Sequence, residues 1–309
     1  MMNNSSSSVA ILLGTYNGAR FINQQLDSYK RQTYNNWSLW ASDDGSSDEG
    51  LGAIKDFSLS VSQSVNLLEG PRQGVCRNFV SLINNENINA SYYAFSDQDD
   101  IWINDKLERA VNWLDTIDAE IPALYCSRTE LINTNGEKVG FSPDYAKPPS
   151  FANALLQNIA SGNTMVFNNK ARELLRQVAD GEMVIHDWAL YLVVTACGGH
   201  VFFDRKPTVL YRQHDNNVIG NGMGLMTRIA NFRKAHHGRK AAWNDTNIAM
   251  MRLIGGQMTA DNQRRLNDFF AIRNSSLIQR LRLLRHSGVY HQQLAGTLTT
   301  VSYTLLNRM

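Results

Sequence analysis

The chain has 309 residues, of which 43% are hydrophobic and 19% are charged, so it can bury a large core and is neither disordered nor collagen-like. It contains no run of eighteen uncharged apolar residues, and its first residues lack the basic start and small-residue cleavage site of a secretory signal. Its three cysteines fit neither a disulfide framework nor a zinc site and indicate a reducing compartment, so we expect a cytoplasmic protein.

The first 114 residues alternate between short apolar runs and segments with helical spacing. The expected strands are residues 9–14, 37–42, 65–68 and 92–96, and the expected helices are residues 20–32, 75–84 and 104–114, with a further helix capped by Ser47 or Asp48. This repetition is typical of an α/β protein with an open, mostly parallel sheet flanked by helices. Ligands bind beyond the carboxyl ends of such strands, so we expect residues 15–17, 43–44 and 97–100 to converge on one crevice.

The second half of the sequence is less regular. We expect strands at residues 123–131, 163–168, 201–203 and 208–211, a hairpin-type turn at 133–136, a helix start near 186–188, and helices at 228–235, 246–254, 260–270 and 275–285. The predicted organisation is a disordered N-terminus (residues 1–8), an α/β domain (residues 9–220) and a helical C-terminal region (residues 221–309).

Charge is distributed unevenly between these parts. Residues 221–309 contain 13 Lys and Arg against 3 Asp and Glu, whereas the first 220 residues contain 17 basic and 25 acidic residues. The basic region favours an anionic partner, and residues 277–285 combine Leu and Ile with Arg280, Arg282 and Arg285, which suits an anionic membrane surface. The alternatives are packing on the acidic domain or an oligomer interface. No aromatic-basic motif indicates nucleic-acid binding.

The acidic segment Asp97-Gln98-Asp99-Asp100 follows an apolar strand. Three carboxylates so close together repel one another, and a hard divalent cation that also binds substrate phosphates would relieve the repulsion. The alternative is a solvated acidic turn that caps the helix beginning near residue 104.

Two other turns offer nucleotide contacts. Asp44 could accept a hydrogen bond from the imide N–H of a pyrimidine, and Thr15, Tyr16 and Asn17 could reach a base or ribose. Each of these turns has an ordinary structural explanation as well, because Asx turns and capping residues have the same composition.

A reaction centre is predicted at His186-Asp187-Trp188. A partly desolvated Asp187 suits a general base, and Trp188 could offer a flat face to a sugar; otherwise Asp187 caps a helix and Trp188 lies in the core. Further along, Arg212 could pair with a diphosphate, and His214 could ligate a metal, bind a phosphate or be a structural histidine.

Several enzyme classes are disfavoured by missing motifs. The sequence contains neither Gly-x-Gly-x-x-Gly nor Gly-x-x-x-x-Gly-Lys-Ser/Thr, which argues against dinucleotide-binding and P-loop enzymes. It also lacks Gly-x-Ser-x-Gly, so an α/β-hydrolase is unsupported.

The segments ILLGTYNGARFINQQLDSYKRQTYNNWSLWASDDGSSD, SDQDDIWINDKL, HDW and YRQH occur in this order. Together they resemble the family-two inverting glycosyltransferases, over roughly residues 8–220. FSDQDDIW, YRQH and the following Asn216-Asn217 look most like the bacterial rhamnosyltransferases. The resemblance implies a GT-A type, Rossmann-like fold with a C-terminal helical extension, and transfer of a sugar from a nucleotide diphosphate donor with inversion.

The resemblance also implies roles for individual residues. Thr15, Asn17 and Asp44, with the intervening Tyr16, would surround the nucleotide, Asp97 would lie near the ribose or sugar, and Asp99 would bind Mg²⁺ or Mn²⁺. Asp187 matches the catalytic base, and His214 matches the metal or diphosphate contact. His186 stands where many members carry Glu, and we assign it with Trp188 to the acceptor. The chain lacks the Gln-x-x-Arg-Trp motif of processive synthases, which indicates addition of a single sugar.

The leading hypothesis is therefore transfer of L-rhamnose from dTDP-β-L-rhamnose to a saccharide or lipid-linked oligosaccharide in O-antigen or other surface polysaccharide biosynthesis. Such an enzyme would be cytoplasmic or peripheral on the inner membrane. The alternatives are a UDP-hexose or UDP-N-acetylhexosamine donor, a nucleotidyltransferase, and a non-catalytic sugar-nucleotide-binding protein.

Overall fold

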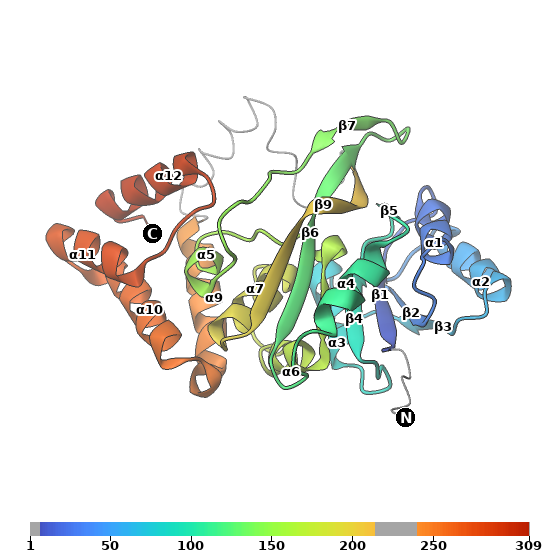
Figure 1. Cartoon of the computed structure of the whole chain (residues 1–309), viewed down its shortest axis with the longest axis horizontal. Helices are drawn as coiled ribbons and strands as arrows, with labels where there is room; N and C mark the ends of the chain where they lie inside the picture. Colours follow the sequence, from blue (N-terminus) through green and yellow to red (C-terminus); the bar gives the residue numbers. More distant parts are fainter. Residues whose placement is uncertain (1–6, 214–239, 309) are drawn as a thin grey trace.

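The computed structural model describes residues 7–213 and 240–308, and within them a nine-stranded mixed sheet forms the centre of the protein (Figure 1). Four parallel strands lie side by side in the order β3-β2-β1-β4. Their bounds are β1 Val9–Thr15, β2 Trp37–Asp43, β3 Val65–Glu69 and β4 Tyr92–Ser96. All four predicted strands of this half are confirmed. β1 and β4 are almost completely buried, whereas β3, at the edge of the sheet, is half-buried.

The other half of the sheet is mixed in direction. It continues from β4 through β8 (Val166–Asn168), β6 (Ala123–Ile132), β9 (His200–Arg212) and β5 (Ile101–Trp102). β8 is antiparallel to both of its neighbours, β6 and β9 are parallel, and β5 is antiparallel to β9. A hairpin joins β6 to β7 (Lys138–Phe141) around the predicted turn, where Gly136 adopts a φ of 85°.

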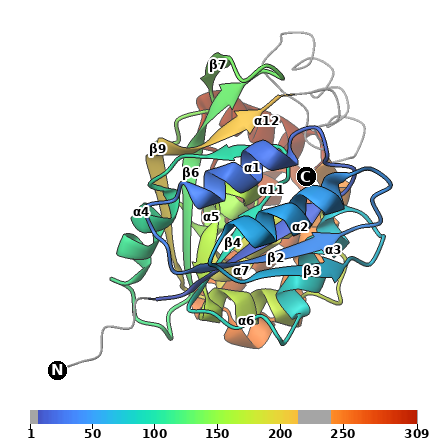
Figure 2. The same ribbon diagram turned by 90° about the vertical axis from the view of Figure 1, so that its right-hand side faces the viewer.

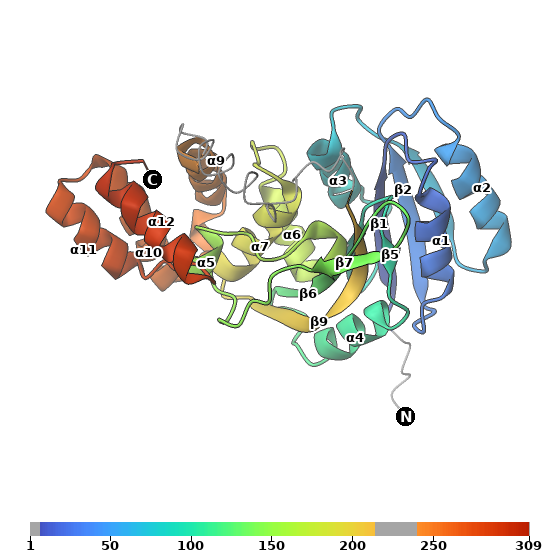
Figure 3. The same cartoon turned by 90° about the horizontal axis from the view of Figure 1, so that it is seen from above.

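Helices cover both faces of the sheet (Figures 2 and 3). One core contains apolar residues of α1 (Ile22–Lys30), α2 (Gly50–Ser60) and α4 (Lys106–Leu114). The other contains residues of α3 (Val75–Asn84), α5 (Phe151–Ala154), α6 (Asn169–Gln177) and α7 (His186–Ala196). Alternate residues of β1 serve the two cores: Ile11 and Leu13 belong to the first, and Ala10 and Leu12 to the second.

The C-terminal helices continue the second core. They are α9 (Lys240–Leu253), α10 (Ala260–Ala271), α11 (Leu277–Ser287) and α12 (Leu294–Leu305). Ile248 and Met251 of α9 are buried in the cluster that contains α7, and Leu266 and Phe269 of α10 belong to it as well. Figure 1 shows α10, α11 and α12 at the end of the molecule opposite β3. The described helices α9 and α10 of the predicted C-terminal region therefore pack on the α/β domain.

Several predicted elements differ in the structure. The two short strands expected at 201–203 and 208–211 are one strand, β9, whose pairing with β6 shifts register between Ser127 and Thr129, near Pro207. The strand expected at 163–168 begins only at Val166, because residues 162–164 form a 3-10 helix. β5, β7, α5, α6 and α12 were not predicted from the sequence.

The limits of the described segments, at residues 7, 213, 240 and 308, determine which of the remaining predictions can be compared with the structure. Ser7 and Ser8, placed in the disordered N-terminus, already bond to the fold: Ser7 Oγ donates to Asp115 at 2.9 Å, and Ser8 O accepts from Tyr92 N at 3.0 Å. The predicted helix 228–235, the boundary at residue 220 and His214 lie outside the described residues. No described helix combines the length and apolarity needed to cross a membrane.

Candidate active site

Gln98 joins the turn after β1 to the acidic turn after β4. Its Oε1 accepts from Thr15 Oγ1 at 2.8 Å and from Tyr16 N at 2.9 Å, and its Nε2 donates to Tyr16 O at 2.9 Å. A Cβ on Gly18 would lie 2.2 Å from Gln98 Oε1, so glycine is needed for this close approach. The sequence analysis gave Gln98 no role, although it lies between the acidic residues of the motif.

Asn17 and Asp44 hold the neighbouring turns. Asn17, at a φ of 49°, donates from its backbone N–H to Ser46 Oγ at 2.8 Å, and its Oδ1 accepts from Ser47 N at 2.9 Å. The buried Asp44 accepts from Arg72 N at 2.6 Å and from Gly74 N at 2.7 Å. Both side chains thus stabilise turns at the carboxyl edge of the sheet, where Tyr16 is 57% exposed.

The aspartates of the acidic turn have different surroundings. Asp100 is buried and accepts hydrogen bonds from Asn163 Nδ2 and, at 2.9 Å, from Arg212 N. Burial and the charges of Asp99 and Asp97 raise the pKa of Asp100 well above its usual range. Asp97 and Asp99 are partly exposed. Asp100 therefore holds the turn from inside, and the other two carboxylates are the ones placed to meet a ligand.

Asp187 lies in the first turn of α7, close to the acidic turn. Its Oδ2 accepts from Gly162 N at 3.1 Å and its Oδ1 from Trp188 N at 2.5 Å. Burial raises the pKa of Asp187 to about 6, and hydrogen bonds from the backbone of Trp188 and Gly162 oppose the rise. The pKa of Asp97 rises to about 7 through burial and repulsion by Asp99 and Asp187. The fold thus brings residues 97–99 and 187 into one electrostatic cluster.

Two further residues of this cluster escaped the sequence analysis. Tyr211 is half-buried, and burial together with the charges of the four surrounding aspartates raises the pKa of its phenol. Lys106 is buried with Nζ 2.8 Å from Asn163 O and 4.3 Å from the ring centroid of Trp102. Burial lowers the pKa of Lys106 to about 7, although the negative charges of Asp100 and Asp97 act in the opposite direction and raise it. Both residues stand within the quoted motifs, but only the fold brings them near enough to the carboxylates for the charges to affect their pKa values.

Arg212 has a structural role beside the acidic turn. Its guanidinium is buried, donating from Nε to Asp99 O at 2.9 Å, from Nη1 to Asn133 O and Thr134 O at 3.2 Å each, and from Nη2 to Gln24 Oε1 at 2.5 Å. A group so enclosed by protein acceptors holds the acidic turn against the β6–β7 hairpin. The predicted contact of Arg212 with the nucleotide diphosphate stays a prediction.

His186 and Trp188, for which acceptor contacts are predicted, are both buried. The His186 ring is buried, stacked on Phe79 at 4.1 Å and edge-on to Phe95 at 4.8 Å. Burial lowers the pKa of His186 to about 3, so the imidazole is neutral. Trp188 is buried with Nε1 2.7 Å from Ala154 O. α7 thus directs both rings into the core, and their contacts with the acceptor stay predictions.

A divalent cation fits the partly exposed carboxylates. Within residues 7–213 and 240–308, no three His, Cys, Asp or Glu side chains form a metal-binding group. Mg²⁺, however, is commonly bound through one or two carboxylates together with substrate phosphates. The repulsion that raises the pKa of Asp97 is the kind of strain that a cation beside Asp97 and Asp99 would relieve.

These features are accompanied by clear relationships to known proteins. The model of "Glycosyl transferase family 2" matches residues 10–173, which include the ends of β1, β2 and β4, and the chain belongs to this family. Over 229 residues it is 33% identical to the dTDP-rhamnosyl transferase RfbG of Shigella flexneri, an alignment that covers 70% of this chain and 76% of that protein. The chain is therefore a glycosyltransferase, which sets aside the non-catalytic and nucleotidyltransferase alternatives.

Solved structures confirm the fold. TarS (1–349) of S. aureus, solved with UDP-GlcNAc, has a TM-score of 0.54 at 12% identity, covering 97% of this chain and 90% of that one. The mannosyltransferase PcManGT of Pyrobaculum calidifontis, solved with GDP-Man and Mn²⁺, has a TM-score of 0.53 at 15% identity, covering 98% of this chain and 86% of that one. The predicted GT-A fold, with a mixed rather than mostly parallel sheet, is thus established.

Proposed function

We propose that this glycosyltransferase adds a single L-rhamnose from dTDP-β-L-rhamnose to a saccharide acceptor, with inversion and with a divalent metal, in the synthesis of O-antigen or another surface polysaccharide. The observation that carries the proposal is the position of Asp187. Its carboxylate is buried, and it lies near enough to Asp97, just after β4, for its charge to raise the pKa of Asp97. The relationship to RfbG supports rhamnose as the sugar.

In this proposal the donor occupies the carboxyl edge of β1, β2 and β4. Thr15, Tyr16, Asn17 and Asp44 surround the nucleotide, and Asp97 contacts the ribose or the sugar. The exposed Tyr16 ring offers a surface for the base, whereas Asn17 and Asp44 keep the two turns in place. Ligands of open α/β sheets bind at this edge.

Asp99, together with His214, would hold Mg²⁺ or Mn²⁺ in the proposed site. A bound divalent cation supplies Lewis-acid neutralisation of the departing diphosphate. Arg212 and Asp100 keep the Asp99 turn in position, because the Arg212 guanidinium binds Asp99 O while Asp100 accepts from Arg212 N.

Asp187 acts as the general base. The acceptor oxygen forms a bond to the anomeric carbon on the face opposite the diphosphate, the bond from that carbon to the phosphate oxygen breaks, and its electron pair leaves with dTDP. The acceptor proton passes to Asp187, whose pKa of about 6 keeps most of the carboxylate ionised near pH 7. Inversion of the β-linked donor gives an α-L-rhamnoside.

A thermal-shift series tests the donor. dTDP-β-L-rhamnose, UDP-glucose, UDP-N-acetylglucosamine and GDP-mannose are added with and without Mn²⁺, because a ligand that binds the folded state raises the melting temperature. We expect the largest rise with dTDP-β-L-rhamnose and Mn²⁺. Stabilisation by GDP-mannose alone would overturn the donor assignment, and preference for a UDP-sugar would favour the alternative donor class, such as the UDP-GlcNAc bound to TarS.

The C-terminal helices carry a proposed membrane contact. Leu277, Ile278 and Leu281 of α11 are 50%, 67% and 41% exposed, and Arg282 and Arg285 of the same helix are exposed as well. Exposed apolar side chains beside arginines suit the surface of an anionic bilayer, which would place the enzyme peripherally on the cytoplasmic membrane.

Co-sedimentation with vesicles tests this contact. We expect binding to phosphatidylglycerol vesicles, weaker binding to phosphatidylcholine vesicles, and loss of binding when Arg280, Arg282 and Arg285 are all changed to Glu. Binding that survives these changes would remove α11 as the contact.

A further inference from the structure

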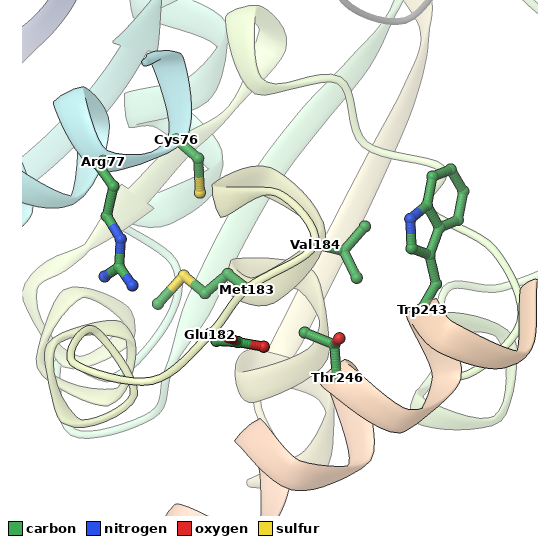
Figure 4. A pocket seen from close by; sticks show the side chains of 7 residues that line it. All are labelled: Cys76, Arg77, Glu182, Met183, Val184, Trp243 and Thr246. Carbon is green, nitrogen blue, oxygen red and sulfur yellow. The ribbon is translucent and has the colours of Figure 1, made fainter. Parts of the chain in front are cut away.

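A pocket of about 360 Å³ lies between the start of α3, the loop before α7 and helix α9 (Figure 4). We call it the α3–α9 pocket, and its lining residues are Cys76 and Arg77 of α3, Glu182, Met183 and Val184 of the loop, and Trp243 and Thr246 of α9. The volume is in the range of small-ligand sites. Three distant parts of the chain form it, including the C-terminal region beyond the matched family model.

The walls of the pocket combine an aromatic ring with polar groups. Trp243 is half-buried, and its ring meets the buried Trp188 at 6.0 Å and 86°, so the core supports the indole from one side. Glu182 supplies carboxylate acceptors, and Thr246 supplies a hydroxyl. Arg77 fixes the loop by donating to Ala179 O at 2.9 Å and Gly181 O at 3.3 Å.

This composition suits a pyranose ring. A sugar has an apolar C–H face, which packs against an aromatic ring, and a rim of hydroxyls, which pair with a carboxylate and a hydroxyl. A hydrocarbon chain would cover the Glu182 carboxylate without giving it a hydrogen-bond partner, which is unfavourable.

The pocket lies beside the start of α7, the helix that carries the residue assigned as general base. Its wall residue Val184 precedes Asp187 by three positions. Cys76, which also lines the pocket, is close enough to the His186 backbone and to Asp187 for both to influence the pKa of its thiol. The residues assigned to the donor stand at the ends of β1, β2 and β4, on other segments. An inverting transfer requires the acceptor to approach beside the base and away from the leaving group.

We propose that the α3–α9 pocket binds a sugar ring of the acceptor, with the ring packed on Trp243 and its hydroxyls bonded to Glu182 and Thr246. This assignment rests on the proposed function, whose acceptor site it specifies. It makes α9 a determinant of acceptor specificity, so the C-terminal region contributes to the reaction as well as to the fold.

Saturation-transfer NMR tests the pocket with methyl α-L-rhamnopyranoside, methyl β-D-galactopyranoside and methyl N-acetyl-β-D-glucosaminide in the presence of dTDP. We expect at least one glycoside to bind, and its affinity to fall roughly tenfold in Trp243→Ala, with partial recovery in Trp243→Phe. Trp113→Phe, in a half-buried tryptophan of α4, is the matched control and leaves binding unchanged.

Because Trp243 also supports Trp188, two variants alter the pocket without removing that contact. Thr246→Val and Glu182→Gln should each weaken glycoside binding several-fold while dTDP binding stays within twofold. The pocket assignment is overturned if none of the three glycosides binds, or if one binds equally to the wild type, Trp243→Ala and Thr246→Val. Failure of dTDP-β-L-rhamnose to stabilise the wild type would instead refute the proposed donor.

Discussion

Gly162 donates its backbone N–H to Asp187 Oδ2 at 3.1 Å, and this bond aims the carboxylate proposed as general base. The next residue, Asn163, donates to Asp100 within the acidic turn and accepts from Lys106 at 2.8 Å. One short segment, folded as a 3-10 helix, therefore connects the proposed base to the turn that carries Asp97 and Asp99. A displacement of this segment should disturb both.

Replacing Gly162 tests that connection. A Cβ at this position would lie 3.0 Å from His186 Nε2 and 3.4 Å from Asp187 Cβ, so Gly162→Ala should push the base out of line. We expect turnover to fall roughly 10–100-fold with donor affinity preserved. Gly52→Ala, where an added Cβ meets nothing within 4 Å, is the matched control. Steady-state kinetics measure the turnover of both variants. Normal turnover of Gly162→Ala would mean that the 3-10 segment does not position the base.

Asp187→Asn tests the base directly. The amide keeps the shape of the side chain but cannot take the acceptor proton, so turnover should fall about 10²–10⁴-fold. Calorimetric titration with dTDP should show affinity close to that of the wild type, because the nucleotide is assigned to other residues. Asp180→Asn, in an exposed aspartate before the same helix, should behave as the wild type. An Asp187→Asn enzyme with near-normal turnover would remove the assignment.

The pH dependence of turnover follows from the raised pKa of Asp187. The base works only when ionised, and its pKa is about 6, so activity should be low below pH 6 and rise to a plateau above it. Rate measurements between pH 4.5 and 8.5 check this expectation. A profile that stays flat down to pH 4.5 would show a base with an ordinary carboxylate pKa.

Arg212→Lys separates the structural role of Arg212 from a diphosphate contact. Lysine cannot reproduce the hydrogen bonds to Asp99 O, Asn133 O and Thr134 O, so the free energy of unfolding should fall by roughly 1–3 kcal/mol. Arg205→Lys, in an ion pair with Asp144 at the surface, should change it by less than about 0.5 kcal/mol. Urea denaturation measures both. If the free energy of unfolding of Arg212→Lys is unchanged and the variant binds dTDP more weakly, Arg212 contacts the diphosphate.

Apart from β5, the order of strands and helices in the first 114 residues could be predicted from the sequence, because the parallel strands are continuous apolar runs and the helices between them have a regular apolar spacing. The same pattern showed that polar residues follow β1, β2 and β4. The family resemblance then implied that Asp187 is the catalytic base and that Asp99 binds the metal. These signals are local, or they depend on the order of motifs along the chain.

Only the tertiary structure decided which of those polar residues face the crevice. Arg212, His186 and Trp188 carry suitable chemistry, yet β9 and α7 direct them into protein interior, where carbonyls and aromatic rings surround them. Nothing in the sequence around Lys106 and Tyr211 predicts a role for them. The fold nevertheless brings both close enough to the aspartates for the negative charges to affect their pKa values. The direction of a side chain and the charges around it depend on contacts between residues far apart in the chain, and these are set by packing rather than by spacing along the sequence.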